Sequence, residues 1–446
     1  MRDLMLLGMM AMLIPLCMRN AFAAYLLWGW SGLIAVQTFA YGYMRGFQYV
    51  LVFAIISLVL LMMRRDPEMR PFKANGVTVL MVCFGVHATA CAALAYPGIS
   101  RNWEITTDLY KTLLYSLLMP MMVTSRFRVH AMVLALGLSA GFHGLIEGLK
   151  FIASGGAHLS QGNEKLGDRN HFAVLVAMGL PFVLYLVWYS RNKLIRLAAL
   201  GALLVNLLSV IATQSRGGLL SLIALALYFA LTSRRKIQGL IGIGVLGIIM
   251  LAVAPDSWTQ RMDTIQTAEQ DSSFMGRVIA WKRASAIAME HPVFGGGIRS
   301  VQNPNVFEKY RNSQGFLGFV ETPPAHYAAA AHSIYFEVIS DMGFVGLFLF
   351  LALVSVPFVM NRRVRKLSQE IGPSARWAHD LTRMICAGMV AYLVGGASIS
   401  AAYFEMAYIM ISLSTVLYLL MKQEAEAKRA AASDARAVLQ PRPAAR

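Results

Sequence analysis

The sequence predicts an all-α polytopic membrane protein with about 12 transmembrane helices and one long, partly helical loop on the outer side of the membrane. The chain has 446 residues, of which 57% are hydrophobic and only 14% are charged, whereas soluble domains carry about 25% charged residues. Its apolar residues form blocks of roughly 15–25 residues, and a helix needs about 20 to cross a bilayer core. These observations exclude a disordered chain, a soluble enzyme and the short alternating strands of a β-barrel.

The apolar blocks define the spans in chain order. The first two, 4–18 and 21–40, are separated only by Arg19 and Asn20, so they form either a hairpin or one span with an interfacial piece. The boundaries of the others follow from the polar residues between the blocks. They are expected near 47–63, 77–95, 109–124, 129–153, 171–189, 194–213, 217–232, 237–254, 332–360, 382–398 and 402–421.

The basic residues predict which ends of the spans face the cytoplasm. The formal net charge is +17, and more than half of the 40 Lys and Arg residues lie in loops at every second span boundary or in the C-terminal tail. This is the distribution that the positive-inside rule gives, so the charge indicates topology rather than nucleic-acid binding. The basic loops lie near 64–73, 126–128, 191–196, 234–236 and 362–383, and the tail follows residue 421.

Cysteine usage and the N-terminus predict neither a disulfide scaffold nor a cleaved leader. Cys17, Cys83, Cys91 and Cys386 all lie in apolar stretches and form no C-x-x-C motif, so no disulfide framework or zinc site is expected. The apolar run after Met1 has no small-residue cleavage site before the next block, and we interpret it as a retained span.

Four regions follow from this pattern. Residues 1–254 hold the N-terminal spans, 255–331 the long outer loop, 332–421 the C-terminal spans and 422–446 a cytoplasmic tail whose Ala, Arg, Glu and Pro content predicts disorder. The loop has equal numbers of acidic and basic residues and is much longer than a connection requires, which is typical of a functional loop. Within it, 275–290 is expected to be a helix, ended by Pro292 and the glycines 295–297.

The first candidate site residue on the outer side is Arg216, in the sequence Thr-Gln-Ser-Arg-Gly-Gly of residues 213–218. An arginine this close to hydrocarbon is costly unless it has a partner. Gly217 and Gly218 allow another segment to approach the backbone closely. The alternative is an arginine that only extends its side chain from a short turn to the membrane surface.

The second candidate is Arg277, in the first turn of the expected loop helix, with Trp281 one turn later. Backbone N–H groups at a helix N-terminus favour an anion, so this pair is suited to a negatively charged substrate. The alternative is an amphipathic helix on the membrane surface. It would turn Trp281, Ile287 and Met289 toward lipid and leave Arg277, Lys282 and Arg283 in solvent.

The third candidate is His332, expected where the span after the long loop begins. A helix N-terminus disfavours added positive charge, so the imidazole stays neutral and can accept a proton. His326 lies six residues earlier, in the Pro-rich part of the loop. His171 and Arg169 enter another span on the same side, and a structural rather than catalytic role for any single histidine remains the alternative.

Together these residues point to a substrate with a phosphate or pyrophosphate. The planar fork of arginine fits phosphate oxygens, and two arginines can neutralise a pyrophosphate leaving group while a base activates an incoming hydroxyl. The outer loops have no D-x-D pair and the chain has no H-E-x-x-H motif, so no metal site and no cofactor are expected.

These motifs resemble the signature blocks of the O-antigen ligase superfamily, which includes O-antigen ligases, O-antigen polymerases and bacterial protein O-oligosaccharyltransferases. The resemblance runs nearly end to end and is strongest to proteobacterial O-antigen ligases. Where family members commonly have His-Asn, this chain has His332-Ser333. The blocks are Thr213 to Gly218, Gly276-Arg277 with Trp281, Pro292 with Gly295 to Gly297, and His332-Ser333 with Gly343 to Gly346.

The resemblance implies a GT-C-type glycosyltransferase of the bacterial inner membrane with a periplasmic active site. Its donor would be a glycan on undecaprenyl pyrophosphate, its acceptor lipid A–core of lipopolysaccharide, and its mechanism metal-independent and inverting. Arg216 and Arg277 would bind the pyrophosphate and His332 would activate the acceptor hydroxyl. Arg169, His171, His326 and Trp281 are further substrate-binding candidates.

Three other functions remain open from the residues alone. A polymerase would use the same donor but a second lipid-linked glycan as acceptor, and a protein oligosaccharyltransferase would use a Ser or Thr side chain. A transporter of lipid-linked sugar is less consistent with the sequence, because transporters place polar residues near the bilayer midplane. Here the polar candidates gather at one end of the spans.

Overall fold

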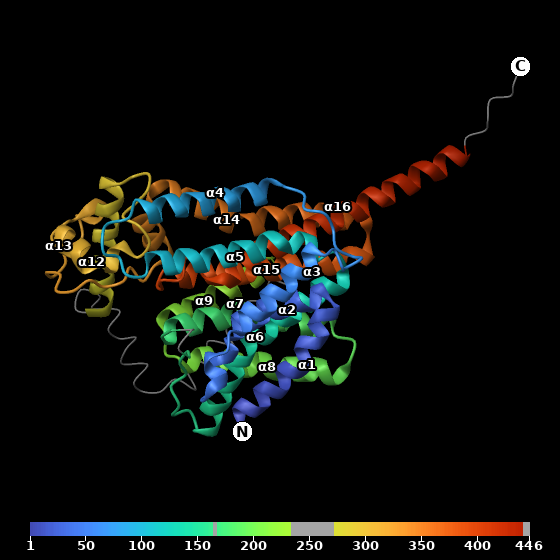
Figure 1. The fold of residues 1–446 in the computed structure, drawn as a ribbon, viewed down its shortest axis with the longest axis horizontal. Coiled ribbons are helices and arrows are strands. Elements are labelled where there is room, and N and C mark those ends of the chain that lie inside the picture. The colour runs from blue at the N-terminus through green and yellow to red at the C-terminus, as the bar shows by residue number, and fades with distance from the viewer. Residues whose placement is uncertain (164–166, 233–271, 440–446) are drawn as a thin grey trace, which may run out of the picture.

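The computed structural model describes residues 1–163, 167–232 and 272–439, and every regular element in these ranges is a helix (Figure 1). Six of these helices are long and apolar enough to cross a membrane. The predicted all-helical membrane fold is therefore confirmed, while the number of about 12 spans stays a prediction. The expected span 237–254 lies outside the described residues.

The helices of the first half follow the apolar blocks closely. They are α1 (Arg2–Arg19), α2 (Ala21–Ile34), α3 (Tyr49–Met62), α4 (Gly76–Ala93), α5 (Asn102–Met122), α6 (Arg126–Ala153), α7 (Arg169–Tyr189), α8 (Lys193–Ala212) and α9 (Arg216–Thr232). The predicted block 21–40 is divided, because Ala35 is left-handed and ends α2 before the 3₁₀ turns η1 (Val36–Phe39) and η2 (Tyr43–Gly46).

The second half contains the long loop and three further long helices. The loop includes α12 (Ser272–Glu290), which confirms the expected helix 275–290, and the short α13 (Pro304–Tyr310). The 3₁₀ turns η4 (Ser300–Gln302) and η5 (Gly315–Leu317) also belong to it. The long helices are α14 (Ile334–Ile371), α15 (Arg376–Gly396) and α16 (Glu405–Leu439), with η6 (Pro373–Ala375) between the first two.

Short polar side chains begin several of these helices where the sequence changes from polar to apolar. Asn75 accepts hydrogen bonds from the backbone of Val77 and Thr78, and Asn192 accepts one from Leu194. These side chains bind backbone N–H groups that have no partner inside the helix. The first residues of α4 and α8 are therefore determined by these capping side chains.

The bundle has α14 and α7 as its main packing helices. α14 packs against α4, α12, α15 and α16, and α7 packs against α6, α8 and α15. Figure 1 shows α12 and α13 together at one end of the bundle, while α16 leaves the opposite end. α7, α9 and α14 thus connect the loop end to the end from which α16 projects.

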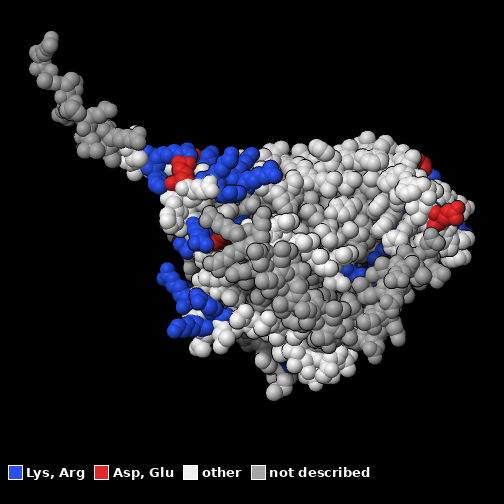
Figure 2. All heavy atoms as spheres, turned by 180° about the vertical axis from the view of Figure 1, so that it is seen from behind, with Lys and Arg blue, Asp and Glu red and all other residues white. Residues whose placement is uncertain are grey.

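The charged side chains are distributed along the same axis. Figure 2 shows Lys and Arg gathered at the end from which α16 projects, and few charged side chains among the described residues between the two ends of the face in view. An uncharged band between polar ends is what a bilayer requires, and an excess of Lys and Arg marks the cytoplasmic side. The distribution supports the predicted orientation, with α12 and α13 outside.

The C-terminal tail differs from its prediction. Residues 422–446 were expected to be disordered, but α16 continues through this region to Leu439. Ala, Glu, Lys and Arg are strong helix formers, and Lys428 Nζ donates hydrogen bonds to the carbonyls of Glu370 and Ile371 at the end of α14 (2.8 and 2.9 Å). The low hydrophobicity of this region suggests disorder when it is considered alone. The region is helical because it continues α16, whose earlier part is buried in the bundle. Residues 440–446 lie outside the described ranges.

Candidate active site

The turn between α8 and α9 begins the site. Gln214 has a left-handed backbone (φ 50°), and the Ser215 hydroxyl that follows accepts a hydrogen bond from the backbone N–H of Gly218 (3.0 Å). The same hydroxyl donates to the Asn170 side-chain oxygen at the start of α7 (2.7 Å). Arg216 is therefore the first residue of a helix whose entry is attached to α7, and its side chain is half-buried.

The two glycines after Arg216 permit this attachment. A Cβ at Gly217 would lie 2.2 Å from Ser398 Oγ, in the connection between α15 and α16. A Cβ at Gly218 would lie 2.5 Å from Ala173 Cβ on α7. Both positions confirm the expectation that another segment approaches this backbone closely.

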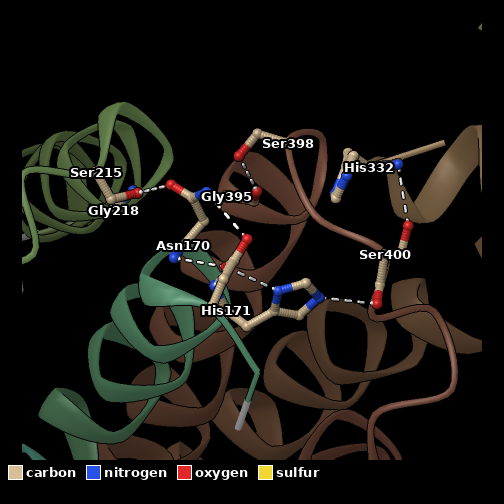
Figure 3. A network of polar contacts seen from close by, with 9 residues as sticks. Asn170, His171, Ser215, Gly218, His332, Gly395, Ser398 and Ser400 are labelled. Carbon is tan, nitrogen blue, oxygen red and sulfur yellow. Dashed lines mark hydrogen bonds and ion pairs between the residues drawn. The ribbon is translucent and has the colours of Figure 1, made fainter. Parts of the chain in front are cut away.

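The start of α7 contributes a hydrogen-bonded carboxylate and imidazole (Figure 3). Asp168 caps α7 and its carboxylate lies 3.1 Å from His171 Nδ1. On its other side, His171 Nε2 lies 3.0 Å from the carbonyl oxygen of Ser400. The hydrogen bond with His171 is the main cause that holds the pKa of Asp168 well below its usual range, so this carboxylate stays ionised at neutral pH.

His332 lies on the other side of Ser400. Its backbone N–H donates to Ser400 Oγ (3.0 Å), so one serine connects His332 and His171 (Figure 3). Glu337, buried on α14, accepts a hydrogen bond from the backbone of Ala402 (2.9 Å) and fixes the connection that carries Ser400. The two histidines, from distant parts of the chain, therefore belong to one polar network.

The pKa of His332 is lowered, as the sequence predicted, but the cause differs. α14 begins only at Ile334, and the Ser333 side chain forms no capping hydrogen bond. Burial is the largest cause of the lowered pKa, and the positive charge of Arg277 is the next. The imidazole is thus kept neutral by desolvation and by an arginine rather than mainly by a helix dipole.

α12 positions the segment before His332. Trp281 Nε1 donates to the Ala331 carbonyl (2.7 Å), and the indole stacks on Phe336 with ring centroids 5.0 Å apart. Arg283 donates to the Ala329 carbonyl (3.1 Å). Two side chains of one helix thereby hold the backbone that leads to His332.

The alternative interpretation of α12 as a helix lying on the membrane surface is wrong. It required Lys282 and Arg283 in solvent, but they are only 4% and 1% exposed. Lys282 Nζ instead binds the side chains of Gln314 and Thr322 (2.6 and 3.0 Å). The polar face of α12 is buried because later residues of the loop pack against it. Hydropathy alone does not reveal this burial.

The glycines after α12 pack against a break in α14. Gly343 has a positive φ (66°) and interrupts the helix, and the N–H of Phe344 donates to the Pro292 carbonyl (2.8 Å). Gly296 N–H donates to the Ser340 carbonyl (2.8 Å). The motif at 292–297 and the motif at 343–346 therefore pack against each other and fix α12 relative to α14.

The structure separates the candidates into two groups. Arg277, Asp168 and His171 are the charged groups that act on the pKa of His332, which places them around one imidazole. Arg169 is the first residue of α7, beside this network, whereas His326 is exposed and is not among those groups. In the ranges that the structure describes, no three His, Cys, Asp or Glu side chains gather as metal ligands would.

Known families match two parts of this chain. Residues 201–351 match the family model described as O-antigen ligase. The chain carries an O-antigen ligase domain. This domain contains Arg216, Arg277, Trp281 and His332, and it indicates a membrane glycosyltransferase of the ligase or polymerase type. Residues 1–191 match a family of unknown function, and no curated protein matches the chain significantly.

The site extends beyond the O-antigen ligase domain. Asp168 and His171 lie in the part that matches the family of unknown function, and Ser398 and Ser400 lie outside both matches. The two serines do not stand out in the sequence, because a short Ser-rich connection has no distinctive pattern. Asp168 followed three residues later by His171 was a usable signal, since an acidic N-cap places both side chains at one helix end.

Proposed function

We propose that the O-antigen ligase domain transfers a glycan from undecaprenyl pyrophosphate to lipid A–core at the periplasmic face of the inner membrane. The proposal is carried by the match of residues 201–351 to the O-antigen ligase family together with the position of His332, which is half-buried, bound to Ser400 through its backbone and close enough to Arg277 for that charge to lower its pKa. A neutral imidazole beside an arginine suits a base that acts next to an anionic leaving group.

The reaction is a single displacement. A hydroxyl oxygen of the acceptor attacks C1 of the donor glycan, and the bond from C1 to the pyrophosphate oxygen breaks. His332 takes the hydroxyl proton, and undecaprenyl pyrophosphate leaves with the electron pair. Attack from the face opposite the leaving group inverts the configuration at C1.

The arginines would stabilise the leaving group. Arg216 begins α9, so its guanidinium lies beside the N–H groups of a helix N-terminus. Arg277 is in the second turn of α12, which begins at Ser272 and not at the expected residue 275, so it would contribute its guanidinium alone. Both favour the charge that develops on the pyrophosphate. We assign the charge neutralisation to these residues, and the transfer is therefore expected to be independent of metal ions.

The remaining candidates would have supporting roles. Arg169 and His171 would contact the donor beside the pyrophosphate, because both lie at the N-terminus of α7. Trp281 would act mainly by holding Ala331, next to the base. His326, exposed in the loop before α14, is the candidate for contact with the acceptor.

The test is transfer by the full chain reconstituted in liposomes in EDTA. Purified donor is supplied with lipid A–core or alone, and products are resolved on a gel. We expect glycan-bearing lipopolysaccharide only when core is present, and loss of most product in Arg216→Ala, Arg277→Ala and His332→Ala. Arg101→Ala, an exposed arginine before α5, is the matched control and should keep its activity.

The other outcomes distinguish the related functions. Longer glycan on the carrier without core would identify a polymerase, and product only with a Ser- or Thr-containing protein would identify an oligosaccharyltransferase. Near-normal transfer in His332→Ala would refute the base assignment. A strict requirement for a divalent cation would contradict the role given to the arginines.

A further inference from the structure

A large polar cavity lies at the opposite end of the bundle from His332. It has a volume of 960 Å³ and opens between the C-terminal ends of α7, α9 and α14 and the start of α15. His332 is near the N-terminal ends of α7 and α9, and α7 has 21 residues, so about 30 Å separates the two places. The cavity is therefore distinct from the proposed active site.

The charged lining of this cavity is mostly positive. Arg365, Arg376 and Arg383 face one carboxylate, Asp380. Asp380 lies 3.5 Å from Arg376 Nε and 3.8 Å from Arg383, and it also accepts a hydrogen bond from the Tyr189 hydroxyl (2.6 Å). One shared carboxylate does not balance three guanidinium groups, so the cavity favours an anion.

Another part of the lining is apolar and exposed. Trp188 and Leu231 are 47% and 73% exposed and border the cavity together with Tyr228. These side chains stand at the ends of α7 and α9, where a tryptophan is typical of the membrane interface. A ligand in this cavity thus meets both arginines and the apolar side chains at the ends of α7 and α9.

We propose that this cavity binds the headgroup of an anionic phospholipid. The arginines bind the phosphate diester through charge-assisted hydrogen bonds, for which the guanidinium fork is well suited. Trp188 and Leu231 contact the glycerol and the first methylenes of the acyl chains. Basic pockets between transmembrane helices on the cytoplasmic side bind such headgroups, and Figure 2 shows the Lys and Arg side chains gathered at this end.

The proposal is independent of glycan transfer and is tested without it. The full chain in detergent is titrated with dioleoyl-phosphatidylglycerol, and bound lipid is counted by native mass spectrometry. The triple variant Arg365→Gln, Arg376→Gln, Arg383→Gln should lose about tenfold or more in affinity. The control variant Arg191→Gln, Lys193→Gln, Arg196→Gln removes the same charge from the connection between α7 and α8 and the first turn of α8, and it should change affinity less than about twofold.

Two further measurements separate the alternatives. Arg365→Gln alone leaves both Asp380 contacts in place and should still weaken binding, which keeps the test valid if the triple variant does not fold. Dioleoyl-phosphatidylcholine should bind weakly to the natural chain. Equal losses in the cavity and control variants, or no loss in Arg365→Gln, would overturn the proposal. Displacement of the lipid by millimolar inorganic phosphate would instead indicate a site for a soluble phosphate.

Discussion

At the scale of single residues, His332, the proposed base, is held in an unusual backbone conformation. Its φ is 45°, a region that costs a non-glycine residue about 1 kcal/mol or more. The residue before it is held by Trp281, and its own N–H is held by Ser400. Neighbouring hydrogen bonds therefore hold the backbone of His332 in a conformation that the residue would not adopt by its own preference.

The pH dependence of transfer follows from the charge beside His332. In the proposed mechanism the neutral imidazole is the active form, and its lowered pKa keeps it neutral until the pH falls below the usual histidine range, near 6.5. Arg277→Gln removes a positive charge that lowers this pKa, so the pKa rises. The acidic limb of kcat/KM against pH, measured on the residual activity, should move to higher pH. An unchanged or more acidic limb would contradict the electrostatic contact.

Trp281 provides a test of positioning as opposed to substrate binding. Trp281→Phe keeps a ring against Phe336 but loses the hydrogen bond to Ala331. A lost hydrogen bond costs about 1 kcal/mol, which predicts a fall in kcat of roughly fivefold. KM for the donor should change little, and a rise in KM alone would show that the indole contacts substrate. Trp103→Phe, an exposed tryptophan on α5, is the control.

At the scale of elements, the close packing of α9 against the connection between α15 and α16 depends on Gly217, because glycine has no side chain. Gly217→Ala places a Cβ 2.2 Å from Ser398 Oγ, and overpacking of this kind costs about 1–3 kcal/mol. We expect a lower melting temperature in detergent and reduced transfer. The double variant Gly217→Ala, Ser398→Gly should recover stability because it removes the obstructing hydroxyl.

Gly201→Ala is the matched control for this prediction. Gly201 lies on α8 and has nothing within 4 Å of an added Cβ, so the substitution should be neutral or slightly stabilising, as alanine favours a helix. Equal destabilisation of both variants would mean that the close approach to Ser398 has no special importance.

The helices could be predicted from the sequence wherever hydrophobicity alone determined their bounds. The blocks 171–189 and 217–232 match α7 and α9 within two residues, because long apolar runs end at polar caps. The division of 21–40 at Ala35 and the continuation of α16 to Leu439 could not be predicted. The first depends on a local backbone conformation, and the second on contacts with α14.

The site was predictable only in part for a similar reason. Arg216, Arg277 and His332 attract attention because charge near a membrane needs an explanation. Ser398 and Ser400 carry no such signal, and their importance comes from where two helices meet. The burial of Lys282 and Arg283 was hidden because a hydropathy scale treats each residue without its neighbours.

At the scale of the whole molecule, two polar sites lie at opposite ends of the helix bundle. His332 and its neighbours occupy the end covered by α12 and α13, while the arginine-lined cavity occupies the end from which α16 projects (Figure 1). α7, α9 and α14 have one end near each. An orientation that places the basic end in the cytoplasm places His332 at the periplasmic face.

This orientation predicts which cysteines a membrane-impermeant maleimide reaches in intact cells. In a chain whose Cys17, Cys83, Cys91 and Cys386 are replaced by serine or alanine, Glu321→Cys tests the loop end and Lys366→Cys the basic end; both positions are exposed. Glu321→Cys should react in cells whose outer membrane alone is permeabilised. Lys366→Cys should react only after the inner membrane is opened, because basic loops stay on the cytoplasmic side. Reaction of Lys366→Cys from outside would reverse the orientation and place His332 away from the proposed periplasmic substrates. Reaction of both cysteines from the same side would contradict the assignment of α14 as one membrane span between these two positions.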